Sequence, residues 1–180
     1  KLGDPEAVFK ADLTELMNVE GMRRDIAKKI MNRSLSTEAE EELRNAERCH
    51  ARIIAYTDPS YPVFLREIYN PPILLYAKGR EIPIAQTFVG VVGSRNPTHY
   101  GRKAAETIAL GLARRGAGVV SGLAKGIDSA AHRGCLRGNG FTIAVVGTGI
   151  DVVYPASNKE LFKQIEANGV IVSEFPTGTH

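Results

Sequence analysis

The stretch that decides the fold is VGVVGSRNPTHYG, residues 89–101, in which a short apolar run breaks into glycine, serine and arginine before an amphipathic segment begins. This order of residues is typical of a buried strand that enters a tight turn and then a helix. Glycine in such a turn lets the backbone approach a neighbour closely. Taken alone, the stretch leaves open whether that neighbour is a dinucleotide, a substrate, a nucleic-acid backbone or an adjacent strand.

The same strand–turn–helix pattern recurs through the rest of the chain. Strands are expected at 88–92, 118–121, 142–146 and 170–173, and helices at about 100–115, 127–137 and 158–168. The strands are apolar with little alternation, which indicates a parallel sheet buried on both faces. The spacing therefore predicts a doubly wound α/β fold, a parallel sheet with helices on both faces and right-handed crossovers.

The first part of the chain, residues 1–48, has a helical pattern instead. Asp12 and Glu15 have the spacing of a capping box at a helix start. LMNVEGMRRDIAKKI, residues 16–30, predicts a helix-hairpin-helix unit that turns at Gly21. Such a turn can present backbone N–H groups to a DNA phosphate, but residues 1–48 as a whole hold more acids than bases. A packing or partner role is at least as well supported as DNA contact.

Composition is that of an ordinary soluble globular protein. The 180 residues are 43% hydrophobic and 24% charged, with a net charge of +3. No apolar run reaches the roughly 18 residues of a membrane span. Cys49 and Cys135 lack metal-ligand spacing, which favours a reducing compartment. We therefore expect a cytoplasmic protein with no membrane contact and no bound metal.

Basic residues are concentrated in one segment. Between Gly90 and Arg137 the sequence has eight Lys or Arg residues and only two acids, Glu106 and Asp128. A concentration of this kind attracts polyanions. A solvated basic helix face explains the same composition, so charge alone does not decide between the two.

Three glycine-bearing turns, GSRNPTHYG (93–101), SGLAKGID (121–128) and GTGIDVVYP (147–155), follow predicted parallel strands. Ligands of open α/β sheets bind at that edge, where helix N-termini favour phosphate. The first two turns also supply glycines for close approach, serine hydroxyls and cations suited to phosphate oxygens. These candidate residues are Gly93, Ser94, Arg95, Ser121, Gly122 and Lys125.

Other chemistries lack their motifs. The sequence contains neither the G-x-G-x-x-G dinucleotide fingerprint nor the Walker A pattern, so no nucleotide cofactor is expected. Asp128 suits the first turn of a helix, and His132 lies one turn later on the same face. This pair is expected to fasten the loop to the helix rather than to perform acid–base catalysis. If the ligand is a nucleic acid, Tyr100 or Tyr154 would stack on its bases. The alternative for both tyrosines is half-buried packing within the protein.

Together, VGVVGSRNPTHYG, VVSGLAKGIDSAAHRG and TIAVVGTGIDVVYPASN resemble the DNA-processing protein A (DprA/Smf) family of bacteria. YPVFLREIYNPPILLYAKG resembles the segment by which that family enters the fold. The resemblance implies an extended Rossmann-like domain, here 49–180, after a small helical domain of the SAM-like or helix-hairpin-helix type, here 1–48. Both domains are expected to be incomplete in these 180 residues.

The resemblance also implies a function and a site. The family binds single-stranded DNA without sequence preference, is not an enzyme, and loads a RecA-type recombinase during natural transformation. Arg95 and Lys125 match the two cations that line its DNA pocket, and the neighbouring matches are Gly93, Ser94, Gly122 and Gly126. A homodimer and recombinase contacts are expected of the full-length protein, since the family forms them largely through a later region.

A different class of function stays as the alternative. Rossmann-like phosphoribohydrolases, which process nucleotides, share this architecture and carry a P-G-G-x-G-T-x-x-E turn. The corresponding segment here, VVGTGIDVVYP, has no glutamate at that place. Fold alone does not separate the two functions.

Overall fold

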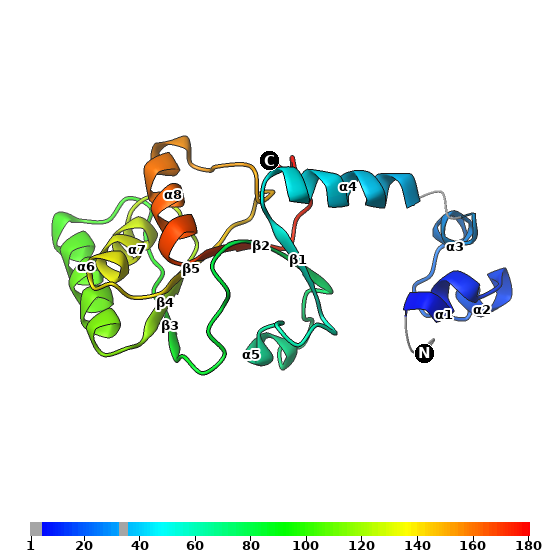
Figure 1. Ribbon diagram of the computed structural model, residues 1–180, viewed down its shortest axis with the longest axis horizontal. Coiled ribbons are helices and arrows are strands. Elements are labelled where there is room, and N and C mark those ends of the chain that lie inside the picture. Colours follow the sequence, from blue (N-terminus) through cyan, green and yellow to red (C-terminus); the bar gives the residue numbers. More distant parts are fainter. Residues whose placement is uncertain (1–4, 33–35) are drawn as a thin grey trace. The chain divides into compact units, whose positions relative to one another are not determined.

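The computed structural model describes residues 5–32 and 36–180. The chain divides into two compact units, Lys1–Arg44 and Asn45–His180 (Figure 1). The division falls within helix α4, Ser36–Arg48, whose last turn therefore belongs to the second unit.

The first unit is helical, with α1 (Pro5–Lys10), α2 (Leu13–Met17) and α3 (Arg24–Met31). The predicted capping box is present: the Glu15 N–H donates to the Asp12 carboxylate at 2.8 Å, and the Asp12 N–H donates to the Glu15 carboxylate at 2.9 Å. Gly21 has a φ of +80° in the turn from α2 to α3, a conformation that glycine adopts without strain. Leu16 and Ala27 are fully buried between the helices.

The second unit is built on a six-stranded sheet with the order β1-β2-β6-β5-β4-β3. β3 to β6 are parallel to one another, whereas β2 is antiparallel to both β1 and β6. The expected parallel sheet is therefore present, and it is extended at one side by an antiparallel pair. The strands are β1 (Arg52–Ala55), β2 (Leu74–Gly79), β3 (Phe88–Gly90), β4 (Gly118–Ser121), β5 (Thr142–Val145) and β6 (Val170–Ser173).

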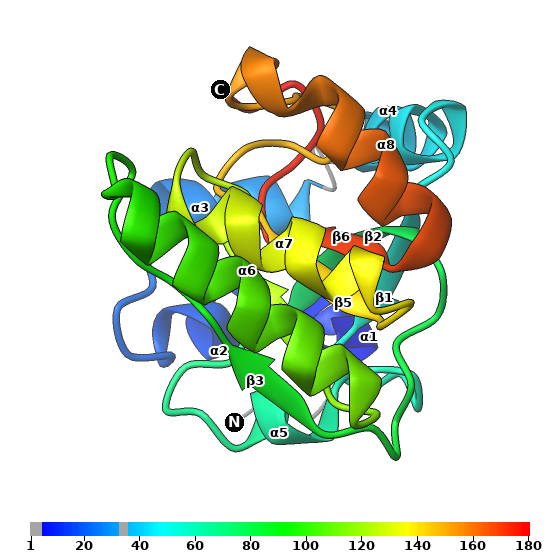
Figure 2. The ribbon, with the colours of Figure 1, turned by 90° about the vertical axis from the view of Figure 1, so that its left-hand side faces the viewer.

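Helices connect the parallel strands in chain order. α6 (His99–Arg114) follows β3, α7 (Ile127–Arg137) follows β4, and α8 (Lys159–Asn168) follows β5 after the short helix η1 (Ala156–Asn158). Because β3 to β6 succeed one another in one direction, right-handed crossovers place all three helices on one face. Figure 2 shows α6 and α7 side by side in front of the sheet. The short helix α5 (Val63–Arg66) and the loops beside it cover the opposite face.

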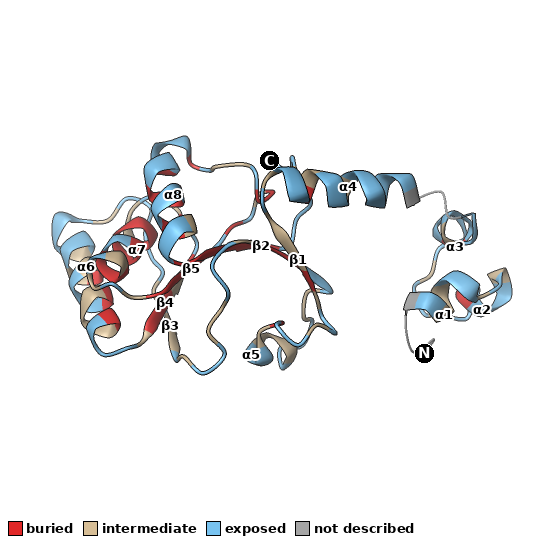
Figure 3. Cartoon of the chain, viewed as in Figure 1, coloured by how far each residue is buried: buried red, intermediate tan, exposed pale blue. Residues whose placement is uncertain are grey.

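The alternation of side chains along each strand separates two cores. Towards α7 and α8, Ala144 and Ile171 pack with Leu161, Phe162 and Ile165 of α8. On the opposite face, Ile143 of β5 and Val170 and Val172 of β6 contribute to a cluster that includes Tyr61 and Leu65. The inner parallel strands β4, β5 and β6 are mostly buried, as their apolar sequences predict and as Figure 3 shows, whereas the edge strand β3 is only partly buried. The expected fold class is thereby confirmed, with the longer helices gathered on one face.

Candidate nucleic-acid interface

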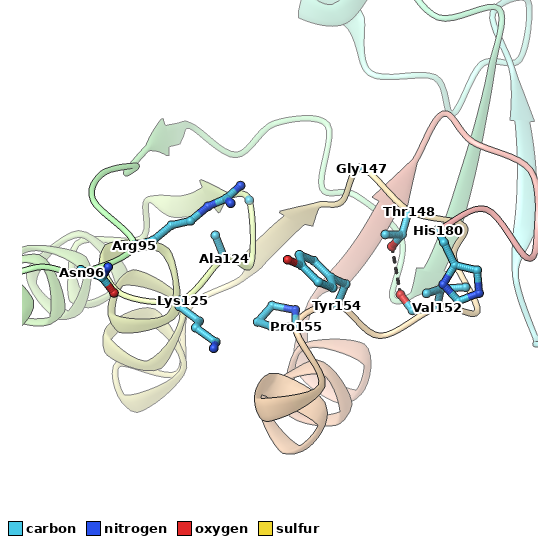
Figure 4. A pocket seen from close by; sticks show the side chains of 11 residues that line it. Arg95, Asn96, Ala124, Lys125, Gly147, Thr148, Val152, Tyr154, Pro155 and His180 are labelled. Atoms are coloured by element: carbon cyan, nitrogen blue, oxygen red, sulfur yellow. Dashed lines mark hydrogen bonds between the residues drawn. The ribbon is translucent and has the colours of Figure 1, made fainter.

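The loops that follow β3, β4 and β5 meet at one edge of the sheet, because the carboxyl ends of parallel strands lie together. They enclose an open cavity of about 790 Å³. Figure 4 shows its lining side chains. The cavity is lined by Arg95, Asn96, Gly122, Ala124, Lys125, Gly147, Thr148, Val152, Tyr154, Pro155 and His180.

One wall of the cavity is positively charged. Arg95 comes from the loop after β3 and Lys125 from the loop after β4, and both side chains are exposed. Neither forms an ion pair with any residue in 5–32 or 36–180. In Figure 4 both lie to the left of Tyr154, with the Arg95 side chain extending upwards to the right and the Lys125 side chain pointing downwards. Two unpaired cations of this kind can bind phosphate oxygens, the arginine through two parallel hydrogen bonds and the lysine as a point charge.

The facing wall is aromatic and apolar. Tyr154 is 64% exposed, and its ring stands in the cavity between Lys125 and the segment around Val152. The hydroxyl of Thr148 donates a 2.9 Å hydrogen bond to the Val152 carbonyl, which fixes the loop that carries this wall. An exposed ring beside two cations can stack on a base while the cations hold the backbone.

Asp128 joins the two charged loops. Its side chain is buried, and its two carboxylate oxygens accept hydrogen bonds from the backbone N–H of Gly93 at 3.3 Å and of Gly122 at 3.2 Å. These N–H groups are therefore already occupied by an anion of the protein itself. The expectation that Asp128 fastens loop to helix agrees with this geometry, although its partners are the two glycines rather than His132. The side chains of Arg95 and Lys125 remain available to bind an anion at this edge.

Gly126 allows the second loop to pack against the first. Its φ is +85°, and a Cβ atom there would collide with the carbonyl oxygens of Ser94 and Arg95. The next residue, Ile127, donates its N–H to the Ser94 carbonyl at 3.1 Å. Gly126 is thus needed to position the loop that carries Arg95.

The serines lie outside the cavity lining. Ser121 is 2% exposed and donates its hydroxyl to the Val91 carbonyl at 2.7 Å. Ser94 is exposed, and its hydroxyl oxygen accepts the N–H of Asn96 at 3.1 Å. Both hydroxyls shape the two loops in this structure.

His132 and Tyr100 are also apart from the cavity. His132 is fully buried, and its Nδ1 lies 2.8 Å from the hydroxyl of Thr142, which donates to the Val119 carbonyl at 2.9 Å. Burial lowers the pKa of this imidazole from 6.5 to about 4. Tyr100 is 82% exposed in the first turn of α6 but does not line the cavity.

Several residues of the site had no individual prediction. Gly147 and Thr148 belong to the third glycine-bearing turn, so their place after β5 was a usable signal. No local sequence signal places His180 at the site. It lies there because the segment after β6 returns to the third glycine-bearing turn, where the Gly149 N–H donates a 2.8 Å hydrogen bond to the Thr179 carbonyl. Asn158 is a buried brace whose amide donates to the Leu123 carbonyl at 2.8 Å.

Metal-binding clusters and membrane-spanning helices are absent from the residues that the structure describes. Within 5–32 and 36–180, no group of three or more His, Cys, Asp or Glu side chains gathers in a way that could hold a metal ion. None of the helices in these two ranges combines the length and the apolar character needed to cross a membrane.

Comparison of sequences relates the chain to known proteins. Residues 52–180 match the profile of the family described as DNA recombination-mediator protein A. Protein Smf of Synechocystis sp. PCC 6803 is 40% identical over 182 residues, which cover 97% of this chain and 45% of that protein. DNA processing protein DprA of Streptococcus pneumoniae is 46% identical over 121 residues, which cover 67% of this chain and 43% of that one. The chain thus spans less than half the length of these relatives.

Solved structures agree with the sequence matches. The crystal structure of DNA processing protein A from Streptococcus pneumoniae matches with a TM-score of 0.82 and 34% identity, covering 94% of this chain and 58% of that one. The DNA processing protein A of Helicobacter pylori matches with a TM-score of 0.62 and 28% identity, covering 73% of this chain and 60% of that one. The Helicobacter structure concerns that protein's single-stranded DNA binding mode.

Proposed function

Because this chain belongs to the DNA-processing protein A (DprA/Smf) family, we propose that it binds single-stranded DNA without sequence preference in the cavity beyond β3, β4 and β5. The observation that carries the proposal is the pairing of two unpaired cations, Arg95 and Lys125, with an exposed Tyr154 across an open cavity. The single-stranded DNA binding of the Helicobacter relative supports the same choice of ligand.

In this proposal the two walls of the cavity bind different parts of the DNA strand. Arg95 and Lys125 take backbone phosphates, and the Tyr154 ring takes a base. Stacking tolerates every base, since each has a π-face, and phosphate contacts carry no sequence information. The proposal therefore needs no base-edge contact and no catalytic group.

For the whole protein we propose the role that the family resemblance implies. It is a cytoplasmic, non-enzymatic protein that protects incoming single strands during natural transformation and passes them to a RecA-type recombinase, acting as a homodimer. Within this chain the proposed division is a helical domain at 1–48 and a Rossmann-like DNA-binding domain at 49–180. The compact units of the structure divide four residues earlier, between Arg44 and Asn45, because the last turn of α4 packs with the second unit.

The decisive experiment is a fluorescence-anisotropy titration of labelled oligo-dT with the double variant Arg95→Ala/Lys125→Ala. We expect a loss of affinity of at least about tenfold, roughly 1.4 kcal/mol. The slope of log K against log salt should fall by about 0.7 for each phosphate that the variant no longer binds. A matched control, Arg114→Ala/Lys163→Ala, removes two exposed cations that do not line the cavity.

Two further ligands separate this function from nucleotide processing. Duplex DNA and a free mononucleotide are titrated under the same conditions, and we expect both to bind far more weakly than the single strand. Unchanged oligo-dT affinity in a folded double variant would overturn the assignment of the site. Tight mononucleotide binding would favour the phosphoribohydrolase alternative instead.

A further inference from the structure

A second cavity, of about 770 Å³, lies at the opposite edge of the sheet. It is formed where the chain enters β5 and β6 and where the antiparallel β2 ends, so it faces away from the loops of the first cavity. Its lining residues are Arg80, Glu106, Arg133, Leu136, Arg137, Asn139, Gly140, Gln164 and Asn168.

Three arginines from two separate parts of the chain meet in this cavity. Arg80 is held in place, because its guanidinium lies 5.7 Å from the centre of the Phe141 ring and its Nη1 donates to the Asn168 carbonyl at 3.4 Å. Arg137 is held by an ion pair with Glu106. The Arg133 side chain forms neither an ion pair nor a hydrogen bond with any described residue. The cavity thus combines fixed guanidinium groups with one that is free to reach a ligand.

The charges in the cavity do not cancel. Glu106 is the only acid among the lining residues, and Arg137 already pairs with it. Arg80 and Arg133 are left without a carboxylate partner in the described parts of the chain. An anionic ligand would supply the missing negative charge, and each guanidinium group can bind a phosphate through two parallel hydrogen bonds.

The remaining polar groups narrow the class of anion. Asn139, Gln164 and Asn168 carry side-chain amides, which both donate and accept hydrogen bonds. Phosphate and carboxylate ligands need donors only, whereas nucleotides also present donors on their bases and sugars. The cavity is also open and much larger than one phosphate group. These features favour a polymer that carries several phosphates together with polar bases.

We propose that this arginine cavity is a second binding site for the phosphate backbone of single-stranded nucleic acid. The choice of polymer rests on the proposed function, whereas the charge and the geometry of the cavity are independent of it. A strand that occupies both cavities contacts both edges of the sheet, so long strands gain more from the second cavity than short ones.

The test uses the 180-residue chain, labelled dT6 and dT30, and anisotropy titrations at fixed salt. Arg133→Ala removes a side chain that forms no ion pair or hydrogen bond within the described parts of the chain, so the fold should be preserved, and Arg80→Ala/Arg133→Ala removes both unmatched cations. Arg114→Ala/Lys163→Ala again controls for loss of net charge. We expect the Arg80/Arg133 double variant to weaken dT30 binding about fivefold or more, Arg133→Ala alone to weaken it about twofold, and the control to change it less than either.

The outcomes distinguish this inference from the proposed function. On an Arg95→Ala/Lys125→Ala background, residual dT30 binding should fall further when Arg80 and Arg133 are also removed. If the Arg95/Lys125 variant binds normally while the Arg80/Arg133 variant does not, the first site fails and the second stands. The second site is overturned if the Arg80/Arg133 variant loses no more dT30 affinity than the Arg114/Lys163 control. Displacement of dT30 from the Arg95/Lys125 variant by poly-glutamate as effectively as by unlabelled dT30 also overturns it, because the cavity then takes acidic chains in general.

Discussion

Acidification should destabilise this protein through His132. The imidazole is fully buried and has a pKa of about 4 in the folded state, against 6.5 in the unfolded chain. Below pH 6.5 the unfolded state therefore binds a proton that the folded state does not, and stability falls as the pH falls towards 4. A difference of this size corresponds to at most about 3 kcal/mol, of which about 2 kcal/mol is already lost at pH 5.

Urea unfolding followed by circular dichroism at pH 7.5, 6.5, 5.5 and 5.0 measures this loss. With a typical denaturant slope, about 2 kcal/mol corresponds to a fall of roughly 1 M in the midpoint. The variant His132→Gln keeps every other titrating group, so the difference between the two proteins isolates the histidine. The reasoning is refuted if wild type and variant lose the same free energy between pH 7.5 and pH 5.

Three substitutions test the loops and the aromatic wall. Asp128→Ala removes the acceptor of two N–H groups, so we expect the free energy of unfolding in urea to fall by about 3 kcal/mol, and by about half as much in Asp128→Asn. An unchanged urea midpoint in Asp128→Ala would contradict the role of Asp128 in joining the two loops. Gly126→Ala places a Cβ at a positive φ and against two carbonyls, so we expect a loss of at least about 2 kcal/mol together with weaker DNA binding. Tyr154→Ala should weaken oligo-dT binding by about 1–3 kcal/mol with little change in stability, whereas Tyr154→Phe should bind normally; equal losses in both variants would argue against stacking.

The sequence predicts the parallel half of the fold closely. Three elements have the predicted bounds, because glycine, asparagine or serine marks where each begins or ends. They are the strands 118–121 and 170–173 and the helix 127–137. The strand predicted at 88–92 stops at Gly90, since the sheet neighbour β4 itself ends at Ser121 and offers little further ladder. The antiparallel pairing of β2 with β6 was beyond prediction, because strand partners far apart in sequence are chosen by tertiary packing.

In the candidate site, too, local sequence predicts some residues, whereas others depend on tertiary contacts. Arg95, Lys125 and Tyr154 follow predicted strand ends, so local sequence places them at one edge. Ser121 and His132 carry chemically suitable groups, but the neighbouring strands bury both, and a local pattern does not reveal that burial. Contacts between distant segments, such as that of Asp128 with Gly93, depend on how the loops meet in space.

The carboxylate of Asp128 has a consequence for the energetics of recognition. In the free protein it already satisfies one amide of each charged loop, so the loops are fixed before any ligand arrives. If the cavity binds DNA as proposed, binding costs little conformational entropy, and the affinity depends mainly on counterion release and stacking. Hydrogen exchange at the Gly93 and Gly122 amides should accordingly be slow in the free chain and change little on DNA binding. Under the proposed function, the cavity is a rigid receptor and the flexible partner in the encounter is the DNA strand.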